Sequence, residues 1–219
     1  NEATIAGVHL RTPMICIHTI AAGGGSQLNY AGGRFQVGPM SAGADPGPAC
    51  YGRGGPLTVT DANLVLGRIQ ADHFPATFGP GADEPLNKQA VITAFAELAE
   101  EISASSGKHY TPEQTATGFL RVAIENMAHA VGHLSIQRGL NPADFTLCSF
   151  GGAGGQHACQ VADSLGMTRI LLDPLAGVLS AWGMGAAPLR SYRQRAANLP
   201  LDQNALAALN DFLSELEPD

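Results

Sequence analysis

The chain has 219 residues and a formal net charge of −7, from 12 Lys and Arg against 19 Asp and Glu. Because no cluster of basic residues stands out, this balance argues against a nucleic acid or an anionic membrane as a partner. No apolar run reaches the roughly 18 residues that a membrane span requires, and no secretory signal opens the chain. The chain does not begin with Met, and we expect it to be a piece of a longer protein.

The composition also bears on whether other domains cover the chain and on the compartment in which it works. Charged residues make up 14% of it, where about 25% is usual, and 27 residues are glycine. These values suit a domain partly covered by other domains, with loops that run close to ligands, and a naturally low-charge domain explains them equally well. The four cysteines, Cys16, Cys50, Cys148 and Cys159, are too far apart for a zinc ribbon or a disulfide scaffold. They predict reduced thiols in a reducing compartment, the cytoplasm.

The first quarter of the chain has the pattern of strands and loops. Residues 3–20 predict two strands, separated by a break at LRTP (10–13), and QLNYAGGRFQVG (27–38) predicts a hairpin whose two adjacent glycines supply the positive φ of the turn. The glycine cluster AAGGGS (21–26) precedes this hairpin. Residues 38–56 hold six glycines and four prolines without periodicity, which is typical of a binding loop or a lid.

The remainder predicts helices and one βαβ unit. Thr60 or Asp61 is expected to cap a short helix that ends at Gly67. Longer helices follow, the second of them opened by a Thr-Pro-Glu-Gln capping box. The predicted order is helix 87–102, helix 111–139, strand 143–150, helix 155–165, strand 168–173 and helices at 174–185 and 202–216.

Four glycines in five residues, at 151–155, stand between the predicted strand and helix of this unit. Glycine removes the Cβ atoms that would block a ligand, and backbone N–H groups at the start of a helix favour an anion such as a phosphate. Tight packing of the helix on its sheet is the alternative reason for these glycines. Ligand approach is the reading that we favour, with Gly151, Gly152, Gly154 and Gly155 as the binding residues.

The identity of the ligand stays open on this pattern alone. Gly152 and Gly154, followed by Asp173 at a strand end, resemble part of the fingerprint that binds a dinucleotide in oxidoreductases. His157, however, occupies the third glycine position of that fingerprint. No Gly-Lys-Ser/Thr sequence follows, so the segment is not a Walker A loop.

Two histidines and one aspartate close to these glycine clusters are the candidates for a catalytic or metal-binding role. His18 and His157 each stand beside a glycine cluster, and Asp45 lies in the Gly/Pro-rich loop. Near a phosphate, such side chains place a metal ion or carry a proton. Capping and core packing are the structural alternatives for each of them.

Three further residues are of a type that acts as a metal ligand or a nucleophile. Cys50 is a candidate nucleophile, but no base is near it in sequence, and a buried apolar role fits better. His129 and His133 have the four-residue spacing of helical metal ligands. No third ligand accompanies them, and their small neighbours favour packing, so the metal-binding residues stay unassigned.

Four segments together resemble the hydantoinase A / 5-oxoprolinase family. They are HTIAAGGGSQL, VGPMSAGADPGPACYGRGGPLTVTDANLVLGRI, FPATFGPGADEPL and CSFGGAGGQHACQVADSLGM. The resemblance runs over residues 6–188, with the motifs in the family's order, and is closest to the ATP-dependent 5-oxoprolinase branch. Bacterial N-methylhydantoinase A and acetone carboxylase subunits share much of the pattern.

This resemblance implies a fold and a reaction. The implied fold is α/β, a three-layer lobe like the second ribonuclease-H-like domain of acetate and sugar kinases, heat-shock chaperones and actin, in which two lobes clamp ATP. We expect this lobe over residues 1–200 and a C-terminal helical segment over 201–219. The implied reaction uses ATP and Mg²⁺ to phosphorylate the lactam of 5-oxo-L-proline, after which water opens the ring to L-glutamate.

The resemblance also assigns expected roles to residues. Residues 151–155 would form the adenosine-side glycine motif, and Gly23, Gly24, Gly25 and Ser26 would line the same cleft. Asp45 and His18 are the catalytic candidates. The two phosphate-binding loops of the family precede this segment, so the chain is expected to hold half of a nucleotide site and to be inactive alone.

Expected partners follow from this incompleteness. They are the N-terminal lobe of the same protein and, as a further candidate, a hydantoinase B-like domain or subunit. Three alternatives stay open: a subunit that acts on hydantoins, a non-catalytic nucleotide-binding module, and the dinucleotide-binding oxidoreductase.

Overall fold

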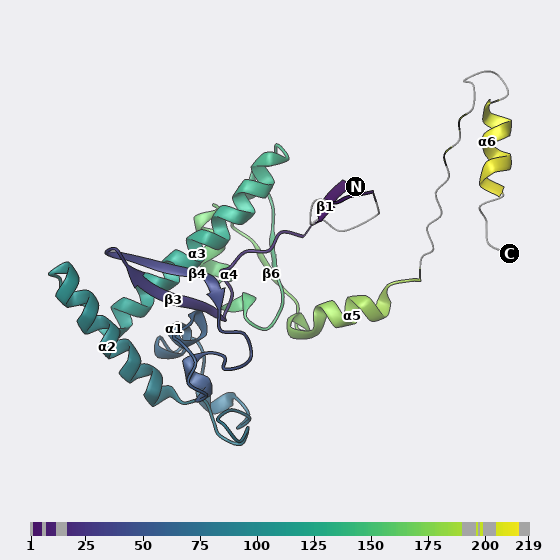
Figure 1. Ribbon diagram of the computed structural model, residues 1–219. Helices are drawn as coiled ribbons and strands as arrows, with labels where there is room; N and C mark the ends of the chain where they lie inside the picture. Colours follow the sequence, from purple (N-terminus) through teal and green to yellow (C-terminus); the bar gives the residue numbers. More distant parts are fainter. Residues whose placement is uncertain are drawn as a thin grey trace. The chain divides into compact units, whose positions relative to one another are not determined.

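The computed structural model describes residues 2–5, 8–11, 17–189, 196, 198 and 205–214. Its internal contacts divide the chain into two groups, residues 1–179 and 180–219, and the first of them contains the core. The structure is of the α/β class (Figure 1). The expected domain boundary after residue 200 stays a prediction. No helix within the described part of the chain is both long and apolar enough to cross a membrane.

The described sheets have two strands each, of which β1–β2 and β3–β4 are antiparallel and β5–β6 is parallel. The strands are β1 Glu2–Ile5, β2 Val8–Arg11, β3 Ser26–Ala31, β4 Arg34–Ser41, β5 Leu147–Ser149 and β6 Ile170–Leu172. The α-helices are α1 Val59–Val65, α2 Lys88–Ser106, α3 Pro112–Gln137, α4 Ala158–Ser164, α5 Leu179–Ala186 and α6 Ala205–Ser214. Short 3₁₀ turns are η1 Ala49–Tyr51, η2 Ala71–His73, η3 Pro142–Asp144, η4 Gly154–Gln156 and η5 Ala176–Val178.

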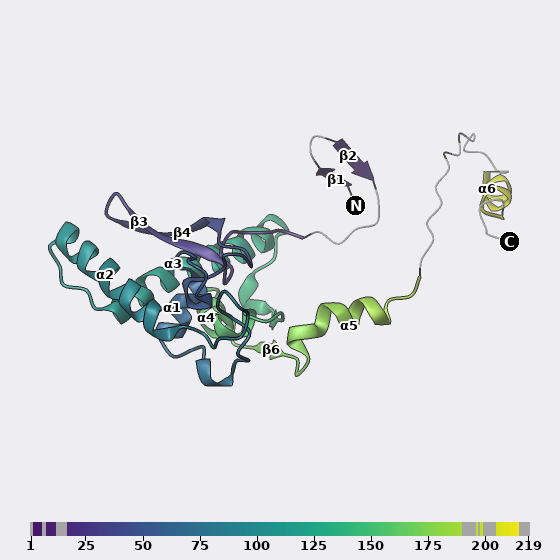
Figure 2. The ribbon, with the colours of Figure 1, turned by 60° about the horizontal axis from the view of Figure 1, so that its bottom comes forward.

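Helix α3 is the central element of the first group, and α1, α2 and α4 pack along it (Figures 1 and 2). The predicted capping box begins it: Thr111 Oγ1 accepts from the Gln114 N–H at 3.2 Å, and Gln114 Oε1 accepts from the Thr111 N–H at 3.0 Å. Its apolar face then enters the core. The largest fully buried side chains there include Phe95 and Ile102 of α2 and Phe119 of α3.

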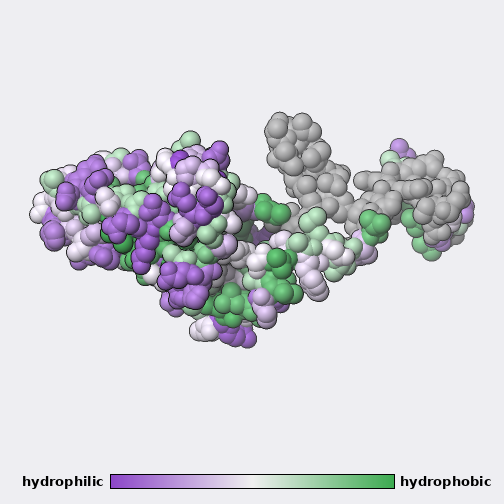
Figure 3. All heavy atoms as spheres, turned by 90° about the horizontal axis from the view of Figure 1, so that it is seen from below, coloured by the Kyte–Doolittle hydropathy of each residue, from purple (hydrophilic) through white to green (hydrophobic). Residues whose placement is uncertain are grey.

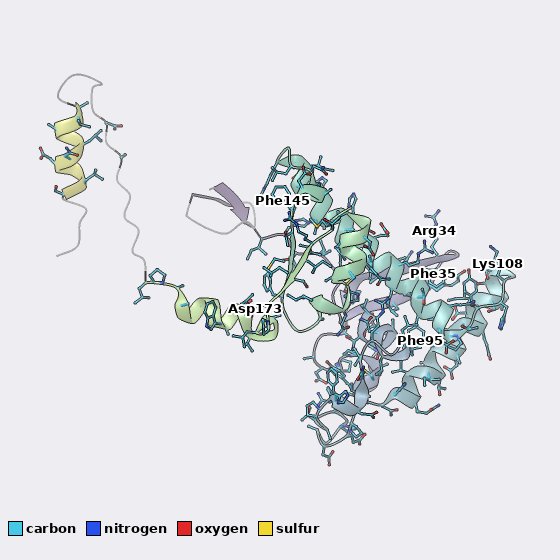
Figure 4. The ribbon with its side chains drawn as sticks, turned by 180° about the vertical axis from the view of Figure 1, so that it is seen from behind. Arg34, Phe35, Phe95, Lys108, Phe145 and Asp173 are labelled. Carbon is cyan, nitrogen blue, oxygen red and sulfur yellow. The ribbon has the colours of Figure 1, made fainter. Side chains whose placement is uncertain are left out.

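The hairpin β3–β4 lies across α3, as its packing contacts and Figure 4 show. Its turn is the predicted one, with φ of 59° at Gly32 and 74° at Gly33. Phe35 of β4 lies so close to α3 that a Cβ on Gly118 would be 3.1 Å from its ring. The ring also packs edge-on against Phe119, with centroids 4.8 Å apart, a favourable aromatic geometry.

The start of α1 differs from the prediction, which placed the cap at Thr60 or Asp61 and was wrong. The helix begins after Thr58, and Asp61 is its third residue. The Asp61 carboxylate accepts from the Thr58 N–H at 2.8 Å and from Thr58 Oγ1 at 2.9 Å. A Thr-x-x-Asp spacing therefore caps the helix two residues earlier than expected. The predicted end is confirmed, with Gly67 in the left-handed region at φ 70°.

The predicted βαβ unit is confirmed by β5, α4 and β6, because α4 contacts both parallel strands. The sheet leaves large apolar side chains in contact with solvent, including Leu171 and Leu172 at 56% and 52% exposure. Figure 3 shows hydrophobic areas among the hydrophilic ones on the face that is seen from below. Parallel sheets normally have both faces covered, and these leucines are uncovered within the described residues.

Candidate functional site

Helix α1 contacts two of the three glycine- or proline-rich segments that the sequence singles out, and the residues just after it reach the edge of the third. Its Thr60 donates from both the N–H and Oγ1 to the carbonyl oxygen of Gly24, at 2.9 and 3.0 Å. Its Asp61 binds the loop of residues 38–56. Just beyond its end, Arg68 Nη1 lies 3.4 Å from the carbonyl oxygen of Gln156, next to the glycines of 151–155. Sequence reasoning did not identify this role of α1.

The turn of residues 23–26 is closed on itself. The Gly23 N–H donates to Ser26 Oγ at 3.0 Å, and the Ser26 N–H donates to the Gly23 carbonyl oxygen at 3.0 Å. A Cβ on Gly24 would lie 2.8 Å from Thr60 Oγ1, and one on Gly25 would lie 3.0 Å from Ser41 Oγ. Close packing thus accounts for Gly24 and Gly25, and the predicted contact of this turn with a nucleotide stays a prediction.

Asp45 lies on the loop that follows β4, and this loop starts beside the turn of residues 23–26. The Ala42 N–H donates to the Gly25 carbonyl oxygen at 2.8 Å, which joins the start of the loop to the turn. Further on, Gly55 lies directly against the backbone of Gly47, where a Cβ would not fit. The loop is therefore tightly packed, and it presents the exposed Asp45 to solvent.

The buried carboxylate of Asp61 fixes the other end of this loop. Besides its two bonds to Thr58, it accepts from the Ala49 N–H at 3.1 Å and from the Cys50 N–H at 2.8 Å. Asp61 is 0% exposed, and a buried carboxylate is tolerated only when hydrogen bonds of this kind satisfy it. From the sequence, Asp61 is expected only as a helix cap, although the Thr-x-x-Asp spacing that pairs it with Thr58 is visible there.

Cys50 is excluded as a nucleophile by its surroundings. Its side chain is fully buried, and burial, together with the negative charge of Asp61, raises the pKa of the thiol far above its ordinary value. A protonated thiol is a poor nucleophile. The interpretation of Cys50 as a buried apolar residue is the one that the structure supports.

We expect alkylation to show this difference between the cysteines. Iodoacetamide at pH 8 should modify Cys148 and Cys159, which are exposed, and leave Cys50 unmodified in the folded protein. Peptide mass spectrometry before and after unfolding in urea measures the three sites. Modification of Cys50 at the rate of the exposed cysteines would show that the loop opens and that the thiol is accessible.

The glycines of residues 151–155 fall into two kinds. Gly154 is packed, because a Cβ there would lie 2.9 Å from Ser149 Oγ. Gly151 and Gly152 are exposed, and a Cβ on either would meet no atom within 4 Å. Gly151 has a φ of 94°, and its N–H donates to the Ala176 carbonyl oxygen at 2.8 Å. The main chain at Gly151 and Gly152 is therefore accessible to a ligand.

Asp173, the acid of the dinucleotide alternative, is engaged in its own turn at the end of β6 (labelled in Figure 4). Its Oδ1 accepts from the Leu175 N–H at 2.7 Å. The turn gives this carboxylate a structural role.

His18 lines a groove with a volume of about 730 Å³ between residues 18–22, β4 and α3. The other polar side chains on its wall include Asn126, His129 and His133. The rings of His129 and His133 stack with centroids 6.1 Å apart. Within the described residues, no three His, Cys, Asp or Glu side chains are close enough to hold a metal ion. Asp45 is not among the residues lining this groove, so His18 and Asp45 do not share it.

The comparison with known proteins identifies the family. The family model of hydantoinase/oxoprolinase matches residues 1–193. The chain belongs to the hydantoinase/oxoprolinase family. It is 40% identical over 220 residues to the 5-oxoprolinase of Dictyostelium discoideum, a match that covers 99% of the chain and 17% of that protein. It is 44% identical over 202 residues to the 5-oxoprolinase of Saccharomyces cerevisiae, covering 92% and 16%.

A solved structure supports the fold of this family member. The crystal structure of the ATP-dependent caprolactamase from Pseudomonas jessenii superposes with a TM-score of 0.66 at 39% identity, over 80% of this chain and 24% of that one. By comparison, the chain spans about a sixth of the length of the two 5-oxoprolinases named above. The family and the α/β class predicted from the sequence are confirmed.

Proposed function

We propose that the chain is part of an ATP-dependent cyclic-amide hydrolase that converts 5-oxo-L-proline to L-glutamate. The observation that carries the proposal is its identity of 40% and 44% to two 5-oxoprolinases over nearly its whole length. A solved neighbour is an ATP-dependent caprolactamase, an enzyme named for another cyclic amide. The reaction class is therefore supported by two kinds of relative, whereas the choice of lactam rests on the 5-oxoprolinases.

The reaction needs ATP because a lactam is a resonance-stabilised amide. Transfer of the γ-phosphoryl group of ATP to the lactam oxygen makes the ring carbon electrophilic. One water then adds to this carbon and the ring C–N bond breaks, which leaves the amine of glutamate and an acyl phosphate. A second water hydrolyses the acyl phosphate to the carboxylate and inorganic phosphate. The accessible main chain at Gly151 and Gly152 fits the adenosine side of the nucleotide. Asp45 and His18 remain the candidates for proton transfer.

Mg²⁺ would accompany the nucleotide. This ion is usually held by one or two carboxylates together with phosphate oxygens and water, and it does not need a cage of protein ligands. The exposed carboxylate of Asp45 is of the right chemical type for such a ligand. The described residues contain no group of three side chains that could hold a metal ion, and the proposal does not need one, because phosphate and water supply the other ligands.

We further propose that the remainder of the polypeptide completes the lobe and the nucleotide site. A sheet of two parallel strands is marginal without further strands or cover, and Leu171, Leu172 and Leu175 of this region are about half exposed. Added strands and helices there would give the three-layer, ribonuclease-H-like lobe that the resemblance implies. The helical segment 201–219 and a hydantoinase B-like partner belong to the same proposal.

The proposal is tested with the full-length protein and a panel of cyclic amides. We expect ADP release in the presence of Mg²⁺ to rise at least tenfold on addition of 5-oxo-L-proline, with L-glutamate formed in proportion. Hydantoin and ε-caprolactam should stimulate it less. Stimulation by hydantoin instead would favour the hydantoinase alternative, and nucleotide binding without turnover would favour the non-catalytic module. Thermal stabilisation by NAD and not by ADP would favour the oxidoreductase.

A further inference from the structure

Asn63 of α1 and His157, at the start of α4, form a buried polar pair. Asn63 is 1% exposed and His157 is 4% exposed. The side-chain nitrogen Nδ2 of Asn63 lies 3.4 Å from Nε2 of the His157 ring. Within the described residues, Asn63 Oδ1 and His157 Nδ1 are buried and have no hydrogen-bond partner. An unpaired buried polar group costs about 1–3 kcal/mol, so apolar residues would be the more stable choice if packing were the only role.

The contact defines the state of the histidine. An amide nitrogen only donates, so Nε2 must accept, and a neutral ring then carries its proton on Nδ1. Burial, and after it the positive charge of Arg68, lower the pKa of His157. The ring is thus held neutral in the tautomer that suits Asn63.

The position of His157 makes it the anchor of the glycine segment. Its N–H donates to the Gly154 carbonyl oxygen at 3.2 Å and so closes η4. The residues before this turn are exposed, and a side chain at Gly151 or Gly152 would touch nothing. The buried His157 ring therefore fixes the end of a segment that otherwise has few packing contacts.

Asn63 belongs to the same short helix whose Thr60 binds the Gly24 carbonyl oxygen. A second contact strengthens the link on the other side, because Arg68 Nη1 donates to Gln160 Oε1 of α4 at 2.7 Å. We propose that Asn63 and His157 are positioning residues, which hold residues 151–156 at a fixed place relative to α1 and to the turn of residues 23–26. Their importance for nucleotide binding rests on the proposed function.

Two substitutions of His157 in the full-length protein separate positioning from packing. Glutamine places its amide where Nε2 stands and can still pair with Asn63, whereas asparagine reaches only the place of Nδ1. We expect hydrogen exchange of the amides of residues 151–156 to rise about tenfold in His157→Asn and to stay within about threefold of the wild type in His157→Gln. ADP affinity should fall about fivefold in His157→Asn only. His109→Asn, at an exposed position just before α3, is the matched control and should change neither.

A double substitution tests whether the two residues act together. Asn63→Leu should raise exchange in residues 151–156 as His157→Asn does, and combining the two should add little. Equal exchange in the glutamine and asparagine variants, or additive effects in the double variant, would overturn the inference. If His157→Asn also raises hydrogen exchange in α2, that variant is destabilised as a whole, and the exchange of residues 151–156 in Asn63→Leu then tests the inference. Failure of the wild type to bind ADP would contradict the proposed function, while the exchange data would still test the positioning.

Discussion

Replacement of Gly152 by valine is expected to lower the ADP affinity of the full-length protein at least tenfold, which corresponds to about 1.4 kcal/mol. The reason is steric. In the proposed site the nucleotide lies directly against the main chain at this residue, and a branched side chain would occupy its place. The backbone of Gly152 does not have a positive φ, and a Cβ there meets no protein atom within 4 Å. The melting temperature without nucleotide should therefore stay within about 1 °C of the wild type.

A control at the other glycine cluster should behave differently. In Gly24→Val the new Cβ would press on Thr60 Oγ1, which is 2.8 Å away, so this variant is expected to lose stability even without nucleotide. Isothermal titration with ADP and thermal melts of both variants give the two readouts. Unchanged ADP affinity in a folded Gly152→Val protein would remove residues 151–155 from the nucleotide site.

Replacement of Asp61 by alanine is expected to destabilise the protein by at least about 3 kcal/mol. The substitution would leave the N–H groups of Ala49, Cys50 and Thr58 without their acceptor, and all of this happens around a side chain that is 0% exposed. For a domain of this size the loss corresponds to a fall of roughly 10 °C in melting temperature. The loop of residues 38–56 should become accessible first.

Limited proteolysis and alkylation locate this effect. In Asp61→Ala we expect cleavage within residues 38–56 and modification of Cys50, neither of which should occur in the wild type. Asp72→Ala, at an exposed position, is the matched control and should melt like the wild type. A melting temperature of Asp61→Ala within 2 °C of the wild type would show that water replaces the carboxylate and that Asp61 does not organise the loop.

Several elements could be predicted because their causes are local. The turn of the β3–β4 hairpin needs two residues with positive φ, and Gly32 and Gly33 supply them in sequence. The start of α3 depends on Thr111 and Gln114, which exchange hydrogen bonds within one helical turn. The cap of α1 was predicted two or three residues too late, because Thr58, Thr60 and Asp61 are all good capping residues. The box of Thr58 and Asp61 that starts the helix is local; what the sequence does not show is that the Asp61 carboxylate also binds the N–H groups of Ala49 and Cys50.

The candidate site was predictable in its parts and not in its arrangement. The sequence marked residues 23–26 and 151–155 as glycine clusters of one kind, but the structure separates packed glycines, such as Gly24, from accessible ones, such as Gly152. From the sequence, His18 and Asp45 were equally good catalytic candidates. In the structure, Asp45 is not among the residues that line the groove beside His18. Which atoms surround a glycine or a histidine depends on segments distant in the chain.

The sequence by itself determined the family of this protein, the order of its helices and strands, and the turns and caps whose partners lie within a few residues. Only the tertiary structure decided that the short helix α1 joins the glycine segments, through Thr60 to Gly24 and through Asn63 to His157. These partners are 36 and 94 residues apart. Local patterns are set by rotation about neighbouring bonds, which each residue type biases in a known way. Distant contacts depend on the path of the whole chain around the core, and no single stretch of residues encodes that path.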